Sequence, residues 1–162
     1  MSAEISVVRA RTDDIATLAD LQWRWRVEEW SGARAVDRAA FATAMRDWFA
    51  EHSESHRPFI ARSDGSVVGM AWLAAIERVV TPAQLTRRDG LVESVYVVPD
   101  ARNRGVGSAL LGRVIDEARQ LGFGYLLVRP SDRSFPLYRR HGFRGDGEFL
   151  SLRFTSDGEQ VP

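Results

Sequence analysis

The sequence of 162 residues contains no cysteine, which excludes disulfide bonds, a thiol nucleophile and thiolate metal ligands. It also has no net charge, because 22 basic residues offset 22 acidic ones. Without an overall field to attract nucleic acid or an anionic membrane, partners must be recognised by local groups. We therefore expect neither nucleic acid nor a membrane among the partners.

The chain also lacks internal repeats, low-complexity tracts and any apolar run of membrane-spanning length. Its first residues, MSAEISVVRARTDD, do not show the basic and apolar pattern of a secretion signal, so we expect a cytoplasmic protein. The length is that of one domain. We place this domain at residues 1–155, followed by a polar, frayed tail at 156–162.

The most informative stretch begins with the β-branched and aromatic run Leu91–Val98, which ends at Pro99 as a strand does. From Val106 onward the apolar residues recur at helical spacing, and Gly122 supplies a helix stop. The stretch therefore predicts a strand, a turn and a helix.

The turn between this strand and helix is Arg102–Ser108, RNRGVGS. Its two glycines let the backbone approach a ligand, two arginines flank them, and the first amides of the helix point outward, so we predict an anion-binding loop. It is not a mononucleotide P-loop, because no lysine follows Gly107, and not a dinucleotide fingerprint, because Leu110 replaces the third glycine. The alternative is a plain surface turn.

The pattern Arg-x-x-Gly-x-Gly after a strand resembles the pyrophosphate loop of the GCN5-related N-acetyltransferase (GNAT) superfamily, with Arg102, Gly105 and Gly107 at the matching positions. The resemblance extends from about Glu4 to Phe154. It implies a single α/β domain with a mixed, largely antiparallel sheet of six or seven strands flanked by about four helices. It also implies acetyl-CoA as cosubstrate and direct transfer of an acetyl group to a primary amine.

The same resemblance implies which residues bind acetyl-CoA. The edge of the 91–98 strand pairs with the pantetheine amides, a bulge opens a slot beside it, and the amides of the loop hold the pyrophosphate. The sequence itself does not show that bulge. An aspartate ahead of the last helix, where related members have asparagine, either contacts the cofactor or caps the helix. The residues expected to bind acetyl-CoA are Val95, Tyr96, Val97, Arg102, Asn103, Arg104, Gly105, Val106, Gly107, Ser108 and Asp132.

Two residues are expected to move protons. Tyr138 lies in PLYRRHGF, which resembles the superfamily's Leu-Tyr-x-x-x-Gly-Phe segment and implies an acid for the departing thiolate. The alternative is a tyrosine that packs a short helix with its hydroxyl in solvent. Glu93 alternates onto the side of Leu91 and Val95 and is predicted as the base, acting directly or through water. The alternative is a glutamate that orders water or pairs with an arginine.

We expect the acceptor pocket to be shaped by residues 20–50 and 77–90. Tryptophans 23, 25 and 30 form either an aromatic box for a cation or core and lid packing. Glu28 and Glu29 beside them either attract an amine or are solvated. Histidines 52, 56 and 141 lack metal-ligand spacing, so we predict no metal and assign them solvated or capping roles.

The preferred interpretation is an N-acetyltransferase with a small-molecule amine as acceptor. Two alternatives stay open: an enzyme that acetylates protein N-termini or lysines, and a non-catalytic acyl-CoA sensor or assembly module. A homodimer is also left open, since no interface is identified by the sequence.

Overall fold

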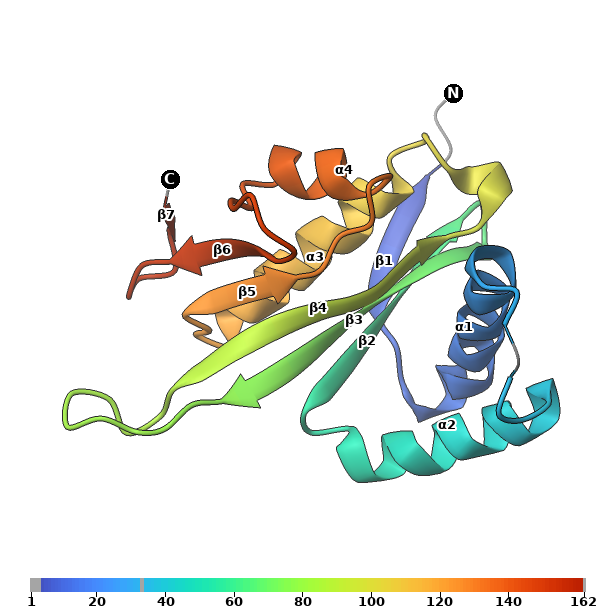
Figure 1. Cartoon of the computed structure of the whole chain (residues 1–162), viewed down its shortest axis with the longest axis horizontal. Coiled ribbons are helices and arrows are strands. Elements are labelled where there is room, and N and C mark those ends of the chain that lie inside the picture. Colours follow the sequence, from blue (N-terminus) through green and yellow to red (C-terminus); the bar gives the residue numbers. More distant parts are fainter. Residues whose placement is uncertain (1–3, 33, 162) are drawn as a thin grey trace.

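The computed structural model describes residues 4–32 and 34–161. It contains one seven-stranded sheet whose strands follow one another in space as they do in sequence (Figure 1). Neighbouring strands are antiparallel, except that β4 and β5 run parallel. The predicted mixed, largely antiparallel sheet is therefore confirmed.

The strands are β1 (Ile5–Arg9), β2 (His56–Ser63), β3 (Ser66–Glu77), β4 (Arg88–Val97), β5 (Tyr125–Val128), β6 (Leu150–Phe154) and β7 (Gln160–Val161). The described residues also form four α-helices, α1 (Ile15–Glu29), α2 (Arg38–His52), α3 (Val106–Gln120) and α4 (Phe135–Arg140). Short 3₁₀ turns occupy Thr12–Asp14 and Pro99–Ala101. Within the described segments, no helix is both long enough and apolar enough to cross a membrane.

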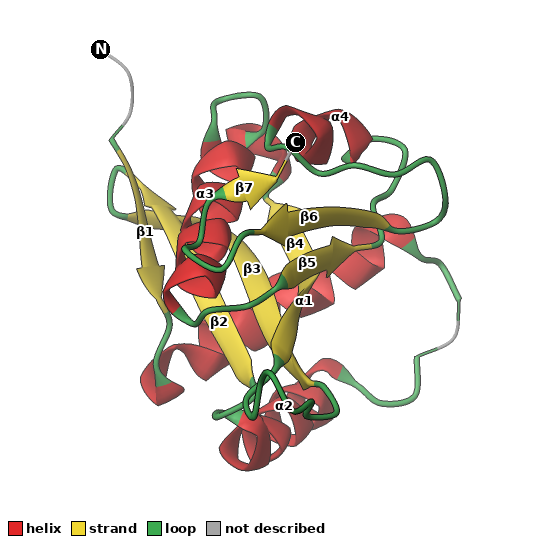
Figure 2. Ribbon diagram, turned by 90° about the vertical axis from the view of Figure 1, so that its left-hand side faces the viewer, coloured by secondary structure: helices red, strands yellow, loops and turns green. Residues whose placement is uncertain are grey.

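Helices cover both faces of the sheet (Figure 2), and each face has its own core. Along β3, Met70 and Trp72 pack with α1 and α2, whereas Ala71 and Leu73 pack with α3. This alternation is what a strand buried on both sides requires. The sheet is therefore the middle layer, and residues that are adjacent along a strand belong to different layers.

Local signals explain several element ends. Asp37 caps α2 by accepting a hydrogen bond from the Ala40 amide at 2.8 Å. Asp64 and Gly65, both with positive φ, make the tight turn between β2 and β3. Gly122, with φ of +68°, follows the end of α3. The sequence predicts all three, because aspartate favours a helix N-cap, an Asp-Gly pair between apolar runs favours a hairpin, and glycine favours a helix stop.

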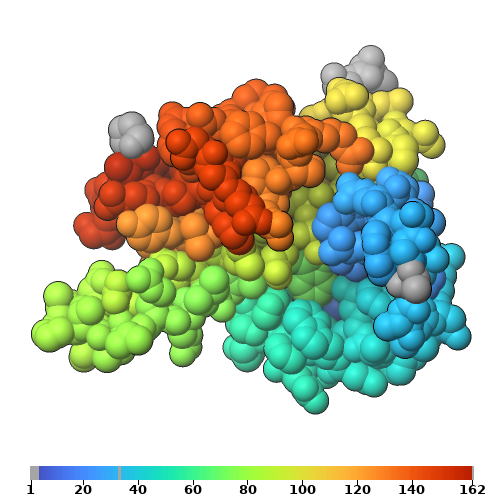
Figure 3. Space-filling view, viewed as in Figure 1, coloured from blue at the N-terminus to red at the C-terminus, as the bar shows by residue number. Residues whose placement is uncertain are grey.

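The sequence predicts a long polar connection at 79–90, but the connection between β3 and β4 is shorter, because β4 begins at Arg88 rather than at Leu91. Residues 78–87 form the tip of a hairpin that projects from the body of the molecule, seen in light green at the left of Figure 3. Val79 and Leu85 on this tip are exposed. The sequence marks the polar turn but not how far the paired strands continue into it.

The expectation of a frayed tail at 156–162 is wrong for its described part. Gln160 and Val161 form β7, which pairs with Phe154 and Arg153 of β6. The turn before β7 is held from α3, because the Arg119 Nε donates a hydrogen bond to the Gly158 carbonyl at 2.9 Å. This segment therefore completes the sheet instead of leaving it.

Candidate functional site

The strand β4 leaves its parallel neighbour β5 after three paired positions, the last being Val92 with Val128. Immediately beyond this point β4 contains a bulge, since its register against β3 passes from Trp72 opposite Glu93 to Met70 opposite Tyr96. Ser94, inside the bulge, has a φ of +50°, which is uncommon for a residue with a Cβ. The bulge implied by the resemblance is thus present, and residues 95–97 form an edge without a β5 partner, called here the free edge.

The bulge also changes which residues share a face. Val95 packs against the α3 core, whereas Tyr96 belongs to the core beneath α1 and α2. Glu93 lies on the α1 and α2 side, opposite Trp72. The prediction that Glu93 and Val95 lie on one side is wrong, because the extra residue reverses the alternation between them.

The predicted anion loop joins the free edge to α3. Asn103 and Gly105 have φ of +61° and +87°, and Gly105 is the N-cap of α3. Gly105 has no side chain with which to cap α3, and the amides of the first turn of a helix lack intrahelical partners. A Cβ on Gly107 would lie 3.4 Å from Leu137 Cδ2 and 4.0 Å from Val97 Cγ2, so this glycine keeps open the space between α3, α4 and β4. The backbone fits a diphosphate group.

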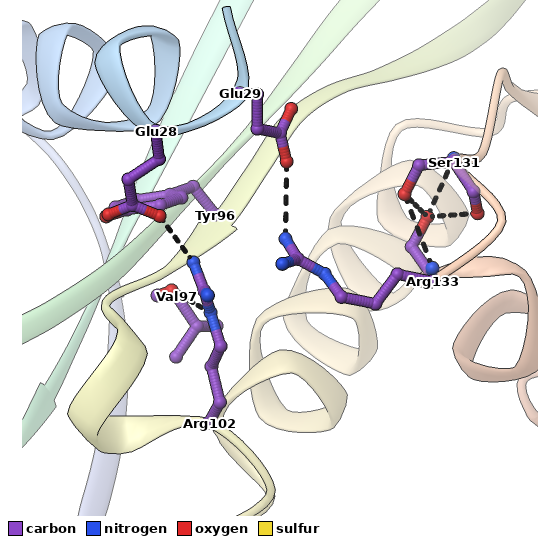
Figure 4. Close-up of polar contacts among 8 residues, drawn as sticks. Glu28, Glu29, Tyr96, Val97, Arg102, Ser131 and Arg133 are labelled. Atoms are coloured by element: carbon purple, nitrogen blue, oxygen red, sulfur yellow. Dashed lines mark hydrogen bonds and ion pairs between the residues drawn. The ribbon is translucent and has the colours of Figure 1, made fainter.

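The side chain of Arg102 is held by contacts with two other segments and does not extend freely at the loop. Its Nε donates to the Val97 carbonyl at 2.9 Å, and its guanidinium donates to Glu28 at 2.7 Å (Figure 4). Arg102 therefore fastens the loop to the free edge and to the end of α1. Arg104 is exposed and lines a separate cavity beside β1.

Glu28 makes hydrogen bonds to other segments of the protein, whereas the sequence suggested that it attracts an amine or is solvated. It accepts hydrogen bonds from the Tyr96 hydroxyl and from Arg102. Burial opposes its charge, but these two hydrogen bonds outweigh that effect and lower the pKa of Glu28. Burial and the neighbouring Glu28 together raise the pKa of Tyr96 to about 12.

Glu29, the next residue of α1, makes a second contact with a distant segment. Glu29 pairs with Arg133, in the segment before α4, at 3.2 Å (Figure 4). The last turn of α1 is thus linked both to β4 and to the segment that follows β5.

Tyr138 lies in α4 and is 4% exposed, so nearly all of its side chain is buried. Its ring packs edge-on against Phe143, with ring centroids 5.5 Å apart. None of the described residues hydrogen-bonds to its hydroxyl. Burial raises the pKa of Tyr138, so the hydroxyl keeps its proton at neutral pH. Asp132 is exposed, and Ser131 and Ser134 make the capping hydrogen bonds of this turn.

A pocket of about 310 Å³ lies beside the bulge, on the α1 and α2 side. Aromatic and apolar side chains of α2 and β3 form most of its wall, and four polar residues from α1, β2 and β4 complete it. The lining residues are Gln22, Phe41, Ala44, Met45, Trp48, His56, Trp72, Glu93 and Ser94. Residues from 20–50 form much of this lining, whereas none from 77–90 contributes to it.

The three tryptophans singled out in the sequence lie outside this pocket. Trp25 packs on the core beneath α1 and α2. Trp23 and Trp30 line another cavity, of about 570 Å³, and Trp30 is 53% exposed. They do not form one aromatic box.

His56 is the pocket residue that the sequence analysis missed. It begins β2, is half-buried, and its ring meets Trp48 edge-on at 4.8 Å between centroids. Burial lowers the pKa of His56, although the nearby Glu93 opposes this shift. No local pattern marks His56, because α2 ends at His52 and His56 begins β2 after a turn. By contrast, His141 hydrogen-bonds to the Leu137 carbonyl at 2.9 Å, the capping role expected of it.

Comparison with known proteins agrees with this geometry. Residues 15–143 match the Acetyltransferase (GNAT) family. An acetyltransferase structure with acetyl-CoA from Clostridium acetobutylicum is similar with a TM-score of 0.74 and 21% identity, over 90% of this chain and 93% of that one. A GCN5-related N-acetyltransferase from Ralstonia eutropha has a TM-score of 0.70 and 24% identity, over 90% and 95% of the two chains. At these identities the structures establish a shared fold.

A curated relative, the IAA acetyltransferase of Azospirillum brasilense, is 34% identical over 96 residues. The match spans 57% of this chain and 58% of that protein. The family match covers most of the chain, and the chain therefore belongs to the acetyltransferase (GNAT) family. Acetyl-CoA is the cosubstrate of this family, so the predicted superfamily and cosubstrate are confirmed.

Proposed function

We propose that this protein transfers an acetyl group from acetyl-CoA to the amine of a small molecule bound in the pocket beside the β4 bulge. The observation that carries the proposal is the position of this pocket. Ser94 and Glu93 line it, and the free edge begins at the very next residue of β4. A thioester placed along that edge would meet an amine in the pocket without any rearrangement of the sheet.

The residues that would hold acetyl-CoA are those of the free edge and the anion loop. The first-turn amides of α3 and the backbone of Asn103–Gly105 would bind the diphosphate. The backbone of residues 95–97 would pair with the pantetheine amides. The Val98 amide donates to the Val68 carbonyl on β3, so the backbone amide and carbonyl of the preceding residue, Val97, point away from β3 towards the free edge. On that side the Val97 carbonyl already accepts a hydrogen bond from Arg102.

Acetyl-CoA supplies an acetyl group activated as a thioester. In the proposed reaction the amine nitrogen bonds to the acetyl carbon while the bond from carbon to sulfur breaks. Glu93 takes a proton from the amine, directly or through water, and Tyr138 gives a proton to the departing sulfur. Its raised pKa suits Tyr138 to this role, because the proton is present at working pH.

The size and the walls of the pocket favour a small acceptor over a polypeptide. The pocket is small, about 310 Å³, and its walls are aromatic. The name of the curated relative, IAA acetyltransferase, also supports acetyl transfer as the activity.

The first experiment is a calorimetric titration of acetyl-CoA into the wild type and two variants, Gly107→Glu and Gly112→Glu. Both glycines lie in α3, and neither added Cβ meets an atom closer than 3.4 Å. Either substitution should preserve the fold, because glutamate favours a helix over glycine by roughly 0.5 to 1 kcal/mol. A carboxylate at position 107, about 5 Å from one phosphate charge, costs about 3 kcal/mol, or about 100-fold in affinity.

We expect this loss for Gly107→Glu and wild-type affinity for Gly112→Glu. Equal affinities in all three proteins would remove the loop assignment. Thiol release with a panel of primary amines then tests transfer itself. All 22 basic residues are arginines, so no lysine of the enzyme can serve as acceptor in this assay.

A further inference from the structure

The hydrogen bonds around His56 determine which of its ring nitrogens is basic. The Ser55 hydroxyl donates to the His52 carbonyl at 3.2 Å. With its single hydrogen directed to His52, the Ser55 oxygen, 2.9 Å from His56 Nδ1, accepts a hydrogen bond from that nitrogen. This arrangement favours the neutral tautomer with the hydrogen on Nδ1 and the lone pair on Nε2. This pair of hydrogen bonds prepares His56 to accept a proton at Nε2.

The surroundings of His56 keep the ring neutral at physiological pH. Trp48 covers it edge-on, and burial lowers the pKa of His56 below its ordinary value of 6.5. The charged and titratable groups that act on it are Glu93 from β4, which raises the pKa, and His52 from α2, which lowers it. The ring centroids of His52 and His56 lie 5.8 Å apart.

The pocket presents hydrogen-bond acceptors to a bound molecule. Among the described residues that line it, Glu93 is the one with a full formal charge at neutral pH. The side-chain oxygen of Gln22 is buried and accepts no hydrogen bond from the described residues. An ammonium group, with three donors and a positive charge, complements such a site. The acceptor would therefore enter in its protonated form and must lose a proton before it can attack.

We propose that His56 accepts this proton at Nε2, while Glu93 holds the ammonium group beside it. The inference rests on the proposed function and adds a catalytic residue to it. The ammonium ion loses one proton to His56 and becomes a neutral amine. The amine nitrogen then bonds to the acetyl carbon and the bond from carbon to sulfur breaks. The nitrogen gives its second proton to Glu93, directly or through water, and Tyr138 gives its proton to the sulfur, which leaves as the thiol. The protons on His56 and Glu93 pass to solvent, from which Tyr138 regains its own.

An imidazole suits this step better than a carboxylate alone. General-base catalysis is most efficient when the pKa of the base lies near the working pH, and histidine is the side chain that meets this condition. Glu93 is exposed at the mouth of the pocket, where a negative charge can attract and orient a cation. Ser55 would act as a positioning residue, since it selects the tautomer without touching the acceptor.

The test compares His56→Gln with the matched control His52→Gln, on two acceptors of the same shape. The first acceptor, 2-phenylethylamine, is an ammonium ion at neutral pH, and its β,β-difluoro analogue is much less basic. Removing a general base should lower kcat for 2-phenylethylamine about 100-fold and affect the difluoro analogue far less, with KM nearly unchanged. His52→Gln should leave both rates close to those of the wild type.

Two further measurements separate a catalytic role from a structural one. Nitrogen-15 NMR of the imidazole should show the Nδ1-protonated tautomer in the wild type and a mixture in Ser55→Ala. The wild-type kcat for 2-phenylethylamine should fall as the pH drops below about 6.5, and His56→Gln should lose this limb.

Several outcomes would overturn the inference. One is an equal loss of kcat in His56→Gln on the two acceptor amines. The others are an unchanged kcat in His56→Gln and an Nε2-protonated His56 ring in the wild type. A wild type that binds acetyl-CoA but transfers acetyl to no amine would overturn the proposed function together with the inference. Transfer that does not need His56 would overturn the inference alone.

Discussion

Replacing Tyr138 with phenylalanine removes a single oxygen atom from a side chain that is 4% exposed. The ring contact with Phe143, at 5.5 Å between centroids, is retained. No described residue loses a hydrogen bond, because none bonds to the hydroxyl. Removing a hydroxyl that has no partner among the described residues is close to neutral, so the free energy of unfolding should change by less than about 1 kcal/mol.

The effect on the reaction should be much larger. If Tyr138 protonates the departing sulfur, Tyr138→Phe removes a general acid and lowers kcat by about 100-fold, equivalent to about 2.7 kcal/mol in the activation barrier. The affinity for acetyl-CoA should stay the same, because the hydroxyl acts on the leaving group. Burial raises the pKa of Tyr138, so this acid should cause no loss of wild-type kcat before the pH passes the ordinary tyrosine value of about 10.

The assay combines calorimetric titration of acetyl-CoA, thermal unfolding and steady-state thiol release for Tyr138→Phe. Tyr125→Phe on β5 is the matched control, since it removes the same atom from a half-buried ring that lies under Arg153. We expect the control to retain kcat. A Tyr138→Phe protein that binds acetyl-CoA and keeps the wild-type kcat would refute the assignment of the acid. A large loss of stability would refute the claim that the hydroxyl is unpaired.

Two other substitutions test charges outside the pocket. Glu28→Gln should tighten acetyl-CoA binding several-fold by calorimetry, an effect that shrinks in high salt, because it removes a negative charge and releases Arg102 near the diphosphate loop. It should also lower the pKa of Tyr96 from about 12 in an ultraviolet titration; an unchanged pKa would contradict this. Glu117→Gln leaves three arginines within 4 Å without their buried carboxylate and should cost about 3 kcal/mol, or roughly 6 to 12 °C in Tm. Asp116→Asn, at an exposed pair, should cost less than about 1 kcal/mol, and similar losses in the two would refute the argument.

The parts of the fold that the sequence predicts are those governed by local chemistry. The helix α3 follows from apolar residues at helical spacing, and these residues are buried in the structure. The β2 to β3 turn follows from an aspartate and glycine that tolerate positive φ. The anion loop follows from Gly105, where the backbone takes a positive φ, and from Gly107 in the first turn of α3. Each signal lies within a few residues of the feature it predicts.

The features that the sequence does not reveal depend on contacts between distant segments. Glu28 and Arg102 are 74 positions apart, so nothing local indicates that they pair. The role of His56 depends on Glu93, which another strand brings to the same pocket. The end of the chain has a polar composition typical of a tail, yet it pairs as β7 because β6 offers an open edge. In each case tertiary structure decides between roles that the residue type alone permits.

The bulge in β4 explains why the acceptor pocket and the free edge lie next to each other. Before the bulge β4 is paired on both sides, and beyond it only β3 remains as a partner. Glu93, ahead of the extra residue, faces α1 and α2, and the extra residue turns Val95 towards α3. The pocket and the free edge therefore meet at Ser94 and are separated by the length of one residue of backbone. Since a hydrogen-bonded strand holds this spacing more rigidly than a loop can, the sheet itself would supply the proximity that direct transfer requires.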